Sequence, residues 1–579
     1  MINAKLLSKL LLLTVASAHT LHATEFARNA GKASDVLDKT LQAIGGTQAL
    51  NAISGLQYHS SQTLTQNYDV IRSDQGVSEA GSQTVSFSFA EKQLQQRIDR
   101  KYQYGDYWIW AFPNLQPDID YSMVVQSGPN GFACFNKGQN SFFTEDPSQP
   151  LGFTDPFLAD YLIHSAQQLA LPYLLKLLLE NPSSLVLSSV VERNYGAELT
   201  TLQIPGLDLL LLIDQSTFLP FAVRAPEDHL IFGPSTSDMV FFNYTNVSVG
   251  GHQMKFPHRI QTLYNTVSVI EDFVIDKLTV NPKFEAGFFS PSNSTKAGHM
   301  APRSSSDYPR SEVHEFFETG LWGGPFGDEF NSSSVQAAPV FPNGSTPEIM
   351  NLFVGYPDYI QMLVEMEDGL IITDAPAFRS SIVVEWVKKN MKGKKITYVV
   401  PSHHHRDHAG GVGDILAAGA TLVIPEVAKP LYANVNGGKF KTITYNEERP
   451  FVLKDHKVQF ASFWHPRAAH AEDWVFSVAA PACWTDTSSE FALFNADVVS
   501  PSSGPAARWD TGYARGFLLD AIADGIPRSA TLIGSHGSSE IGLGHGLNYG
   551  TIKAHQTLIG LVYLGSCLMN RKSLSYPLL

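Results

Sequence analysis

The two halves of the chain differ in how apolar and polar positions alternate. Apolar side chains recur at helical spacing over residues 33–52, whereas over residues 84–89 and 239–244 they alternate with polar ones, as in half-buried strands. Residues 156–179 are strongly apolar and again have helical spacing. We therefore predict that residues 24–290 form a separate α+β domain, in which helices cover one face of a mostly antiparallel and curved sheet.

Residues 291–347 have the composition of a linker. Proline, serine, asparagine and threonine are concentrated at residues 291–295 and 342–347, which is typical of turns and connecting segments. Between these stretches, residues 314–322 have the pattern of a short helix docked on a neighbouring domain. We therefore expect a domain boundary here.

Beyond the linker, short apolar runs and amphipathic helical segments follow one another closely. The expected order is strands at 359–366 and 370–374, a helix at 382–392, a strand at 396–401, a helix at 414–418 and a strand at 420–424. Such mixing indicates an αββα sandwich or a doubly wound sheet. We assign residues 348–555 to this second domain and residues 556–579 to a C-terminal tail.

The N-terminus has the pattern of a secretory signal peptide. Two lysines precede an apolar stretch at residues 10–15, and small residues follow at 16–18. Cleavage is expected after Ala18 or Ala23, so residues 1–23 are predicted to be removed; the alternative is an amphipathic first helix. The apolar stretch is too short to span a bilayer. We expect a secreted protein, extracellular or, in a bacterium, periplasmic.

Composition narrows the range of partners. The chain of 579 residues is 44% hydrophobic and 17% charged, with a formal net charge of −14. This acidic balance argues against binding to nucleic acid or anionic membranes, but it decides nothing about a small substrate, because metal ions can reverse the sign of the field in a pocket. The expected partner is a small-molecule substrate. The 3 cysteines are too few for a disulfide framework, although they allow one bridge, and none has the spacing of a thiolate metal site. Possible N-glycosylation triplets occur at Asn243, Asn246, Asn293, Asn331 and Asn343.

Candidate chemistry is concentrated directly after the predicted strand 396–401. Imidazoles occupy positions 403, 404, 405 and 408, and a carboxylate occupies position 407. Neutral imidazole and carboxylate are the ligands that Zn²⁺ and similar cations prefer. The alternatives are a tract that binds metal incidentally, an exposed pH-sensitive patch, or an accident of sequence.

The spacing of this segment resembles the HxHxDH signature of the metallo-β-lactamase superfamily. The resemblance implies that His403 and His405 bind one metal ion, and that Asp407 and His408 bind a second. It also implies a metallo-β-lactamase-type four-layer αββα sandwich. His404 and Arg406 stand at the variable positions of the signature, and no role is carried over to them.

The family pattern requires three further ligands, each at the end of a strand. His470 fits the third ligand of the first metal, because a predicted strand follows it, whereas His465 precedes a proline. Asp497 ends an apolar run and fits the bridging carboxylate, although an isolated aspartate there is often a turn residue or a helix cap. His536 fits the last ligand of the second metal, with His545 as a rival in a glycine-rich context.

The resemblance implies a hydrolase that binds two divalent ions, zinc or alternatively iron or manganese. A metal-bridging hydroxide would attack an ester, thioester, lactone, amide or phosphoester, and Asp407 would orient it and transfer a proton. Asp374 is either a partner that fixes an imidazole or a strand-end cap. The alternatives are a non-haem iron oxidoreductase and a protein that binds an apolar ligand beside a vestigial metal site.

A second resemblance concerns the N-terminal half. Its pattern over residues 241–289 is similar to the later strands of lipoprotein-carrier-like half-barrels. A generic α+β domain is the alternative.

Overall fold

The computed structural model describes the following parts of the chain: residues 23–72, 75–89, 93–104, 118–138, 152–192, 194–292, 301–303, 308–320, 326, 330–355, 359–467, 470–482, 490–498, 511–527, 529–535 and 547–548. The predicted signal peptide, apart from Ala23, and the tail 556–579 lie outside these residues. Signal cleavage and the role of the tail therefore stay predictions.

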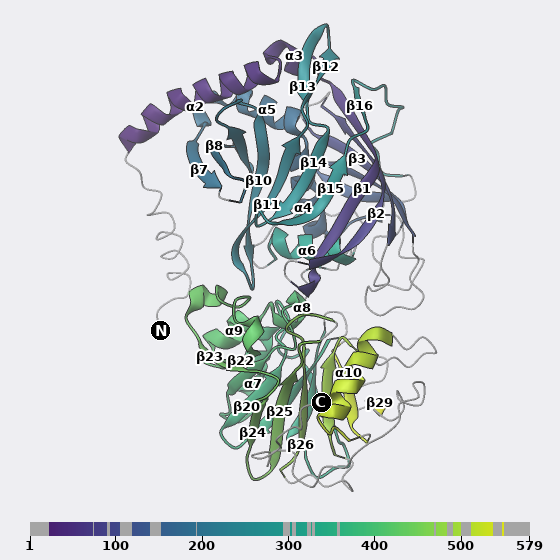
Figure 1. Cartoon of the computed structure of the whole chain (residues 1–579), viewed down its shortest axis with the longest axis vertical. Helices are drawn as coiled ribbons and strands as arrows, with labels where there is room; N and C mark the ends of the chain where they lie inside the picture. The colour runs from purple at the N-terminus through teal and green to yellow at the C-terminus, as the bar shows by residue number, and fades with distance from the viewer. Residues whose placement is uncertain are drawn as a thin grey trace.

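The N-terminal domain is built on a 14-stranded antiparallel sheet with the order β6-β5-β4-β3-β2-β1-β15-β14-β11-β10-β9-β8-β7, in which β16 also pairs with β1 (Figure 1). Its strands are β1 (Gly55–Arg72), β2 (Gln75–Ser88), β3 (Gln95–Tyr104), β4 (Asp118–Gln126), β5 (Phe132–Lys137), β6 (Gly152–Phe153), β7 (Leu187–Glu192), β8 (Ala197–Gln203), β9 (Leu210–Asp214), β10 (Pro220–His229), β11 (Gly233–Phe242), β14 (Arg259–Tyr264), β15 (Ser268–Val274) and β16 (Lys277–Val280). A separate hairpin joins β12 (Thr245–Val249) to β13 (His252–Phe256). The predicted mostly antiparallel sheet is confirmed.

Two helices predicted from the sequence differ in extent from the expectation. The first, α2 (Ala23–Ile44), begins earlier than residue 33 and ends before Gly45 and Gly46, whose positive φ angles stop it; the short α3 (Thr47–Asn51) follows. The apolar segment 156–179 forms α4 (Pro156–Leu169) and α5 (Leu171–Glu180), because Pro172 disfavours a continuous helix.

Helix α4 is fixed to the sheet by polar as well as apolar contacts. It packs on β4, β5 and β10, and also on α6 (Arg310–Gly320), a helix within the segment predicted as linker. The side-chain amide of Gln168 donates hydrogen bonds to the carbonyls of Val223 and Ser237, each at 2.9 Å. These bonds satisfy a buried amide and set the position of α4 against β10 and β11.

The C-terminal domain contains two sheets. The first has the order β17 (Gln336–Pro339), β18 (Ile349–Gly355), β19 (Tyr359–Met366), β20 (Gly369–Thr373), β21 (Ile396–Val400), β22 (Thr421–Pro425), β23 (Lys441–Tyr445), and the second β24 (Phe451–Lys454), β25 (Val458–Trp464), β26 (Val475–Pro481), β27 (Ala492–Ala496), β28 (Thr531–Gly534), β29 (Leu547–Asn548). Strands β20 to β23 are parallel. Because β17 lies within the predicted linker 291–347, this sheet begins before residue 348.

The helices of the C-terminal domain cover the outer faces of the two sheets. They are α7 (Ser380–Asn390), α8 (Arg406–Ala409), α9 (Val412–Ala417) and α10 (Thr511–Ala523). Apolar residues of both sheets, such as Val364 and Phe494, pack in one core between them. Val383 of α7 packs on the outer face of the first sheet, in a cluster that continues into the core of the N-terminal domain. Phe517 of α10 belongs to another cluster outside the second sheet. The predicted αββα sandwich is confirmed.

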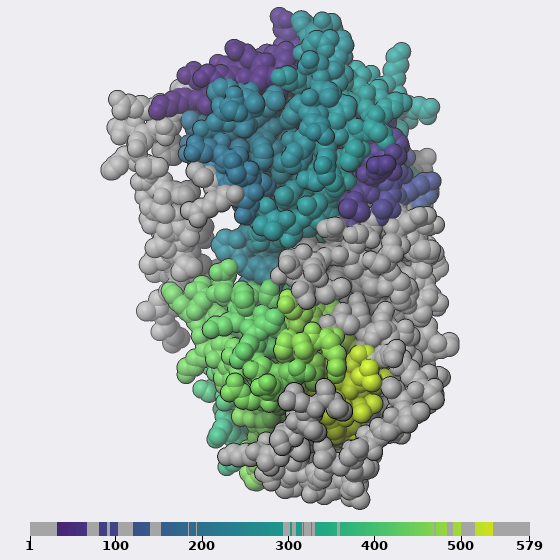
Figure 2. All heavy atoms as spheres, viewed as in Figure 1, coloured from purple at the N-terminus to yellow at the C-terminus, as the bar shows by residue number. Residues whose placement is uncertain are grey.

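The two domains lie directly against each other along the long axis of the molecule (Figure 2). Helix α6 occupies the end of the N-terminal sheet that faces α8 (Figure 1). The ring of Tyr308, just before α6, stacks on Phe378 of the C-terminal domain with a centroid distance of 4.2 Å. The side chain of Asn434 donates a hydrogen bond to the carbonyl of Phe232 at 2.8 Å. The predicted docked helix is therefore present and lies between the domains.

Two remaining expectations concern membranes and cysteines. None of the helices among the described residues has the length and apolar character needed to cross a bilayer. Cys134 is buried, and Cys483 and Cys567 lie outside the described residues.

Candidate metal centre

The histidine-rich loop begins where β21 leaves the first sheet. Loops at the carboxyl ends of parallel strands commonly carry functional sites, because neighbouring strands bring their ends together there. The side chains of His403, His405, Asp407 and His408 are all buried. Burial of so many polar groups is unfavourable unless they find partners, so the surroundings of this loop must supply them.

The first group of potential metal ligands draws on three separate segments. One ligand atom from each of His403, His405, His470 and Asp497 lies within 4.8 Å of all the others. The Nε2 atoms of His403 and His470 are 3.1 Å apart, and Asp497 Oδ2 lies 3.3 Å from His470 Nε2 and 3.7 Å from His403 Nε2. His470 precedes β26, and Asp497 follows β27 directly, so strand ends of the second sheet complete the site.

The second group shares one residue with the first. Ligand atoms of Asp407, His408 and Asp497 also lie within 4.8 Å of one another. His408 Nε2 is 2.9 Å from the Asp497 carboxylate and 3.4 Å from Asp407 Oδ2. The Asp497 carboxylate is therefore within reach of both groups. Three imidazoles with a carboxylate, and one imidazole with two carboxylates, suit divalent cations such as Zn²⁺.

Of the seven residues predicted as ligands, the structure brings together His403, His405, Asp407, His408, His470 and Asp497. His536 lies outside the described residues, which end this segment at Ser535 after β28. The rival His465 points elsewhere, since its Nε2 is 2.7 Å from Asp524 and its Nδ1 is 3.2 Å from Glu447. That the six gathered residues bind metal stays a prediction.

Protonation equilibria divide the imidazoles into two kinds. Burial, reinforced by the neighbouring imidazoles, holds the pKa of His403 and of His405 well below its ordinary value. Burial also acts to lower the pKa of His408, but the carboxylates of Asp407, Asp497 and Asp374 outweigh it and raise that pKa well above its ordinary value. His403 and His405 are therefore neutral at pH 7, which is the state in which imidazole binds metal. His408 instead carries a proton, and its positive charge lies among the three carboxylates.

Asp374 holds His408 from the side opposite Asp497. Its Oδ2 lies 2.8 Å from His408 Nδ1, and its Oδ1 accepts a hydrogen bond of 2.6 Å from the backbone N–H of Ser402. The residue has a φ of 59°, a left-handed conformation that short polar residues tolerate best. Of the two roles considered for Asp374, the contacts favour the partner that orients an imidazole.

Sequence reasoning missed Tyr359. Its hydroxyl lies 2.9 Å from Asp374 Oδ2 and 2.6 Å from His408 Nδ1. The residue begins β19, more than forty positions before His408, and an aromatic residue at the start of a strand gave no signal of this role. Ser535 adds a hydrogen bond of 3.1 Å to Asp374 Oδ2.

The two variable residues of the loop turn away from the candidate ligands. His404 Nδ1 is 2.7 Å from Asp473 Oδ1. The guanidinium of Arg406 donates to the backbone carbonyls of Ser311 and Glu312 of α6 at 3.0 and 3.3 Å, and its Nε lies 3.2 Å from the Glu312 carboxylate. Arg406 thus joins the histidine-rich loop to the helix between the domains.

Comparison with known proteins agrees with this geometry. Residues 362–466 match the model of the metallo-beta-lactamase superfamily. A hydroxyacylglutathione hydrolase from Idiomarina loihiensis is 26% identical over 129 residues, which are 22% of this chain and 49% of that protein. The chain thus spans about half the length of this relative.

Solved metallo-beta-lactamase structures are also similar to the chain. One from Hirschia baltica has 16% identity, covers 36% of this chain and 94% of its own, and gives a TM-score of 0.27. One from Pontibacter korlensis has 18% identity, covers 36% of this chain and 92% of its own, and gives a TM-score of 0.26. The match to the family model alone confirms the resemblance seen in the sequence, and it extends over residues 362–466.

Proposed function

We propose that the C-terminal domain is a metal-dependent hydrolase that binds two divalent cations, with zinc as the metal. The position of Asp497 carries this proposal, because one carboxylate lies within reach of both groups of potential ligands. A carboxylate shared in this way is the usual means of holding two cations close together. The family match supports hydrolysis as the reaction class.

Each group of residues would hold one ion. His403, His405, His470 and Asp497 would bind the first, and Asp407, His408 and Asp497, with His536 as a further proposed ligand, would bind the second. A bound divalent cation lowers the pKa of coordinated water toward about 7 and polarises the oxygen of the substrate.

The residues around the ions would provide orientation and proton transfer. Asp407 Oδ2 lies 3.4 Å from His408 Nε2, so its carboxylate is inside the site and is the proposed acceptor of the proton released by the water nucleophile. Asp374 and Tyr359 fix the ring of His408 through Nδ1, which leaves Nε2 directed at Asp497. No side-chain nucleophile is required.

We propose an ester, thioester, lactone, amide or phosphoester as the substrate class. The name of the relative from Idiomarina loihiensis makes hydroxyacylglutathione the first compound to test. The presence of Asp497, where zinc β-lactamases usually carry cysteine or histidine, argues against antibiotic hydrolysis as the main activity.

The test combines metal analysis with a substrate screen on the purified full-length chain. We expect about two equivalents of zinc and hydrolysis of at least one acyl or phosphoryl substrate. The variant His405→Ala should lose metal and activity, whereas His456→Ala, in an exposed turn, should keep both. Unchanged metal content and activity in His405→Ala would exclude the proposed site, and redox-active iron in place of zinc would favour an oxidoreductase.

We further propose that the protein is exported. The support is the sequence pattern of residues 1–23 alone. Expression of the full-length chain followed by N-terminal sequencing should give a mature protein that begins after Ala18 or Ala23. An intact N-terminus on protein retained in the cytoplasm would contradict export.

A further inference from the structure

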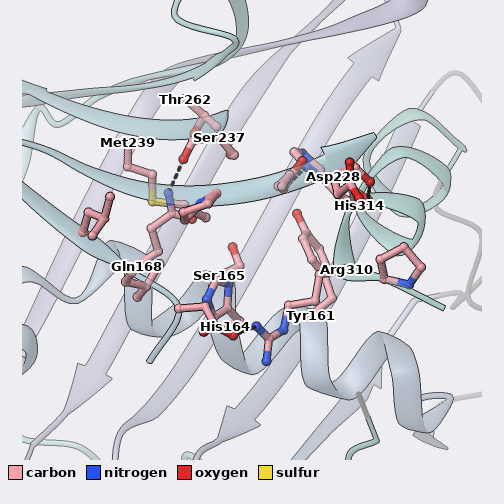
Figure 3. A pocket seen from close by; sticks show the side chains of 18 of the residues that line it. Tyr161, His164, Ser165, Gln168, Asp228, Ser237, Met239, Thr262, Arg310 and His314 are labelled. Carbon is pink, nitrogen blue, oxygen red and sulfur yellow. Dashed lines mark hydrogen bonds and ion pairs between the residues drawn. The ribbon is translucent and has the colours of Figure 1, made fainter. Parts of the chain in front are cut away.

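A cavity of about 440 Å³ is lined by α4, α6 and strands of the N-terminal sheet, and none of its lining residues is a candidate metal ligand. Figure 3 shows Tyr161, His164 and Ser165 of α4 facing Ser237 and Thr262 of the sheet, while Arg310 and His314 of α6 close one side. The volume falls within the range of sites that bind small organic molecules. None of these residues is used by the proposed hydrolase.

Carboxylates predominate among the charged groups that line this cavity. Asp208, Glu227, Asp228 and Glu271 face a single guanidinium, that of Arg310. Arg310 is already bound, since it lies 2.6 Å from Asp160 and 3.3 Å from Asp208. Glu271 is likewise paired, with Arg100 at 2.9 Å. The charge that the cavity offers to a ligand is therefore negative.

Glu227 provides a hydrogen-bond acceptor that nothing in the described part of the chain satisfies. Its side chain is only 7% exposed; Oε1 lies 3.2 Å from His314 Nδ1, and Oε2 is buried without a hydrogen-bond partner. A buried carboxylate oxygen without a donor is unfavourable. A ligand that brings an N–H group or a positive charge to Oε2 would remove this cost.

His164 provides a second unpartnered group in the same cavity. The side chain is buried, and its Nε2 has no hydrogen-bond partner among the described residues. Burial, together with the nearby Arg310, lowers the pKa of His164 to about 4, so the ring is neutral at pH 7 and adds no positive charge. It offers a ligand one more hydrogen bond.

The remaining walls are apolar. Leu209, Ala225, Met239 and Ile270 line the cavity beside the polar groups. They suit a hydrocarbon or aromatic body, but a purely apolar ligand would leave Glu227 and His164 without partners. An anion would meet the surplus of carboxylates. The unpartnered atoms thus disfavour a purely apolar ligand, and the negative charge disfavours an anion.

We propose that this cavity binds a small organic cation, an amine or guanidine on a compact hydrocarbon body, with the cationic group on Glu227. The ligand enters beside Asp208 and Asp228, which are exposed lining residues and attract positive charge. The N-terminal domain is therefore a ligand-binding domain in its own right, whatever the C-terminal domain hydrolyses.

Three compounds of one shape but different charge test the proposal on the full-length protein by isothermal titration calorimetry. Phenethylamine is cationic, phenethyl alcohol is neutral and phenylacetate is anionic; agmatine adds an aliphatic guanidine. We expect saturable binding of phenethylamine or agmatine at millimolar concentration or below, and binding of the alcohol and the anion weaker by about tenfold or more. Failure of both cations to bind, or equal affinity for the alcohol, would overturn the proposal.

Variants then locate the binding site. Glu227→Gln removes the charge and should weaken binding of the cation by about tenfold. Ser165→Leu fills part of the cavity but changes no carboxylate, and it should also weaken binding of the cation. This variant tests the proposal even if Glu227→Gln fails to fold. Glu198→Gln, exposed on β8 and outside the cavity, is the matched control and should bind as the unmodified chain does. Unchanged affinity in the folded cavity variants would overturn the assignment.

Discussion

Buried carboxylates are neutralised in different ways in the two domains. In the N-terminal sheet, the fully buried Asp238 accepts two hydrogen bonds of 2.7 Å from Arg224, which also pairs with Glu192. An arginine is always charged and matches a carboxylate with its fork of donors. The buried carboxylate of Asp238 is therefore neutralised within the protein, and the cluster stabilises the sheet.

In the C-terminal domain, Asp497 instead faces the imidazoles of His403, His408 and His470. The neutral imidazole of His403 cannot neutralise this carboxylate, and His408 can give up its proton, whereas an arginine keeps its charge. A divalent cation would therefore stabilise this group but would only disturb the arginine cluster. The comparison teaches that the partner of a buried carboxylate, more than its burial, separates a structural cluster from a candidate metal centre.

The largest effect is expected from Asp497→Asn. The substitution preserves shape but removes the charge shared by both ligand groups, so hydrolysis should fall to the level of the metal-free protein. Metal content and activity on the best substrate of the screen are the measurements. The control is Asp368→Asn, in an exposed turn between β19 and β20. Full activity in Asp497→Asn would contradict the assignment of Asp497 to a metal centre rather than to a structural cluster.

The next effect concerns the structural cluster. Arg224→Met leaves the buried Asp238 without its partner and should lower the free energy of unfolding by about 3–5 kcal/mol, measured with urea. Metal content per folded molecule should not change. Arg259→Met, which breaks a more exposed pair with Asp272, should cost less than about 1 kcal/mol. Equal costs for the two variants would contradict the role assigned to burial.

A smaller effect is expected at the positioning residue Asp374. Asp374→Asn keeps a residue type that tolerates the positive φ but withdraws the carboxylate from His408, so metal affinity should fall by about 10–100-fold. Tyr359→Phe removes one hydroxyl from the same network and should have a weaker effect. Competition with a chelator measures both. An affinity that does not change in Asp374→Asn would limit this residue to a strand-end cap.

The smallest effect separates His465 from His470. Burial acts to lower the pKa of His465, but the carboxylates of Asp524, Asp520 and Glu447 raise it above its ordinary value of 6.5. A raised folded-state pKa adds stability that is fully present below about pH 6.5 and is lost as the pH rises through the folded-state pKa.

His465→Gln should therefore cost about 1 kcal/mol in acid and progressively less as the pH rises, with no loss of metal. His470→Gln should lose metal instead. Urea unfolding at several pH values, paired with metal analysis, distinguishes them. Loss of metal in His465→Gln would reverse the choice made between the two histidines.

Much of the candidate metal centre could be predicted from the sequence. The residues from His403 to His408 lie within one loop, so their spacing alone brings them together. His470 and Asp497 were assigned through the resemblance, which implies further ligands in this order at strand ends; a strand beside each one fitted that pattern. The same local reasoning found the long helical segments of the N-terminal domain and the strands β19 to β22 that lead to the site, but only a few of the strands in the N-terminal sheet.

Contacts between segments far apart in the chain could not be predicted from the sequence. The pairing of β1 with β15, the position of Tyr359 beside His408 and the ion pair of Arg406 with Glu312 all depend on tertiary packing. The cavity lining also comes from α4, α6 and several strands. No periodicity in one segment reports which other segment it will face.

Helix α6 makes the two halves of the molecule interdependent. One part of it, at Arg310 and His314, closes the cavity, and another, at Ser311 and Glu312, receives the guanidinium that follows His405. A fragment cut at residue 348 would keep every candidate ligand described here yet leave Arg406 without its carboxylate, at the base of the histidine-rich loop. The candidate metal centre therefore depends on helix α6, which lies in the segment predicted as linker, as well as on the second domain.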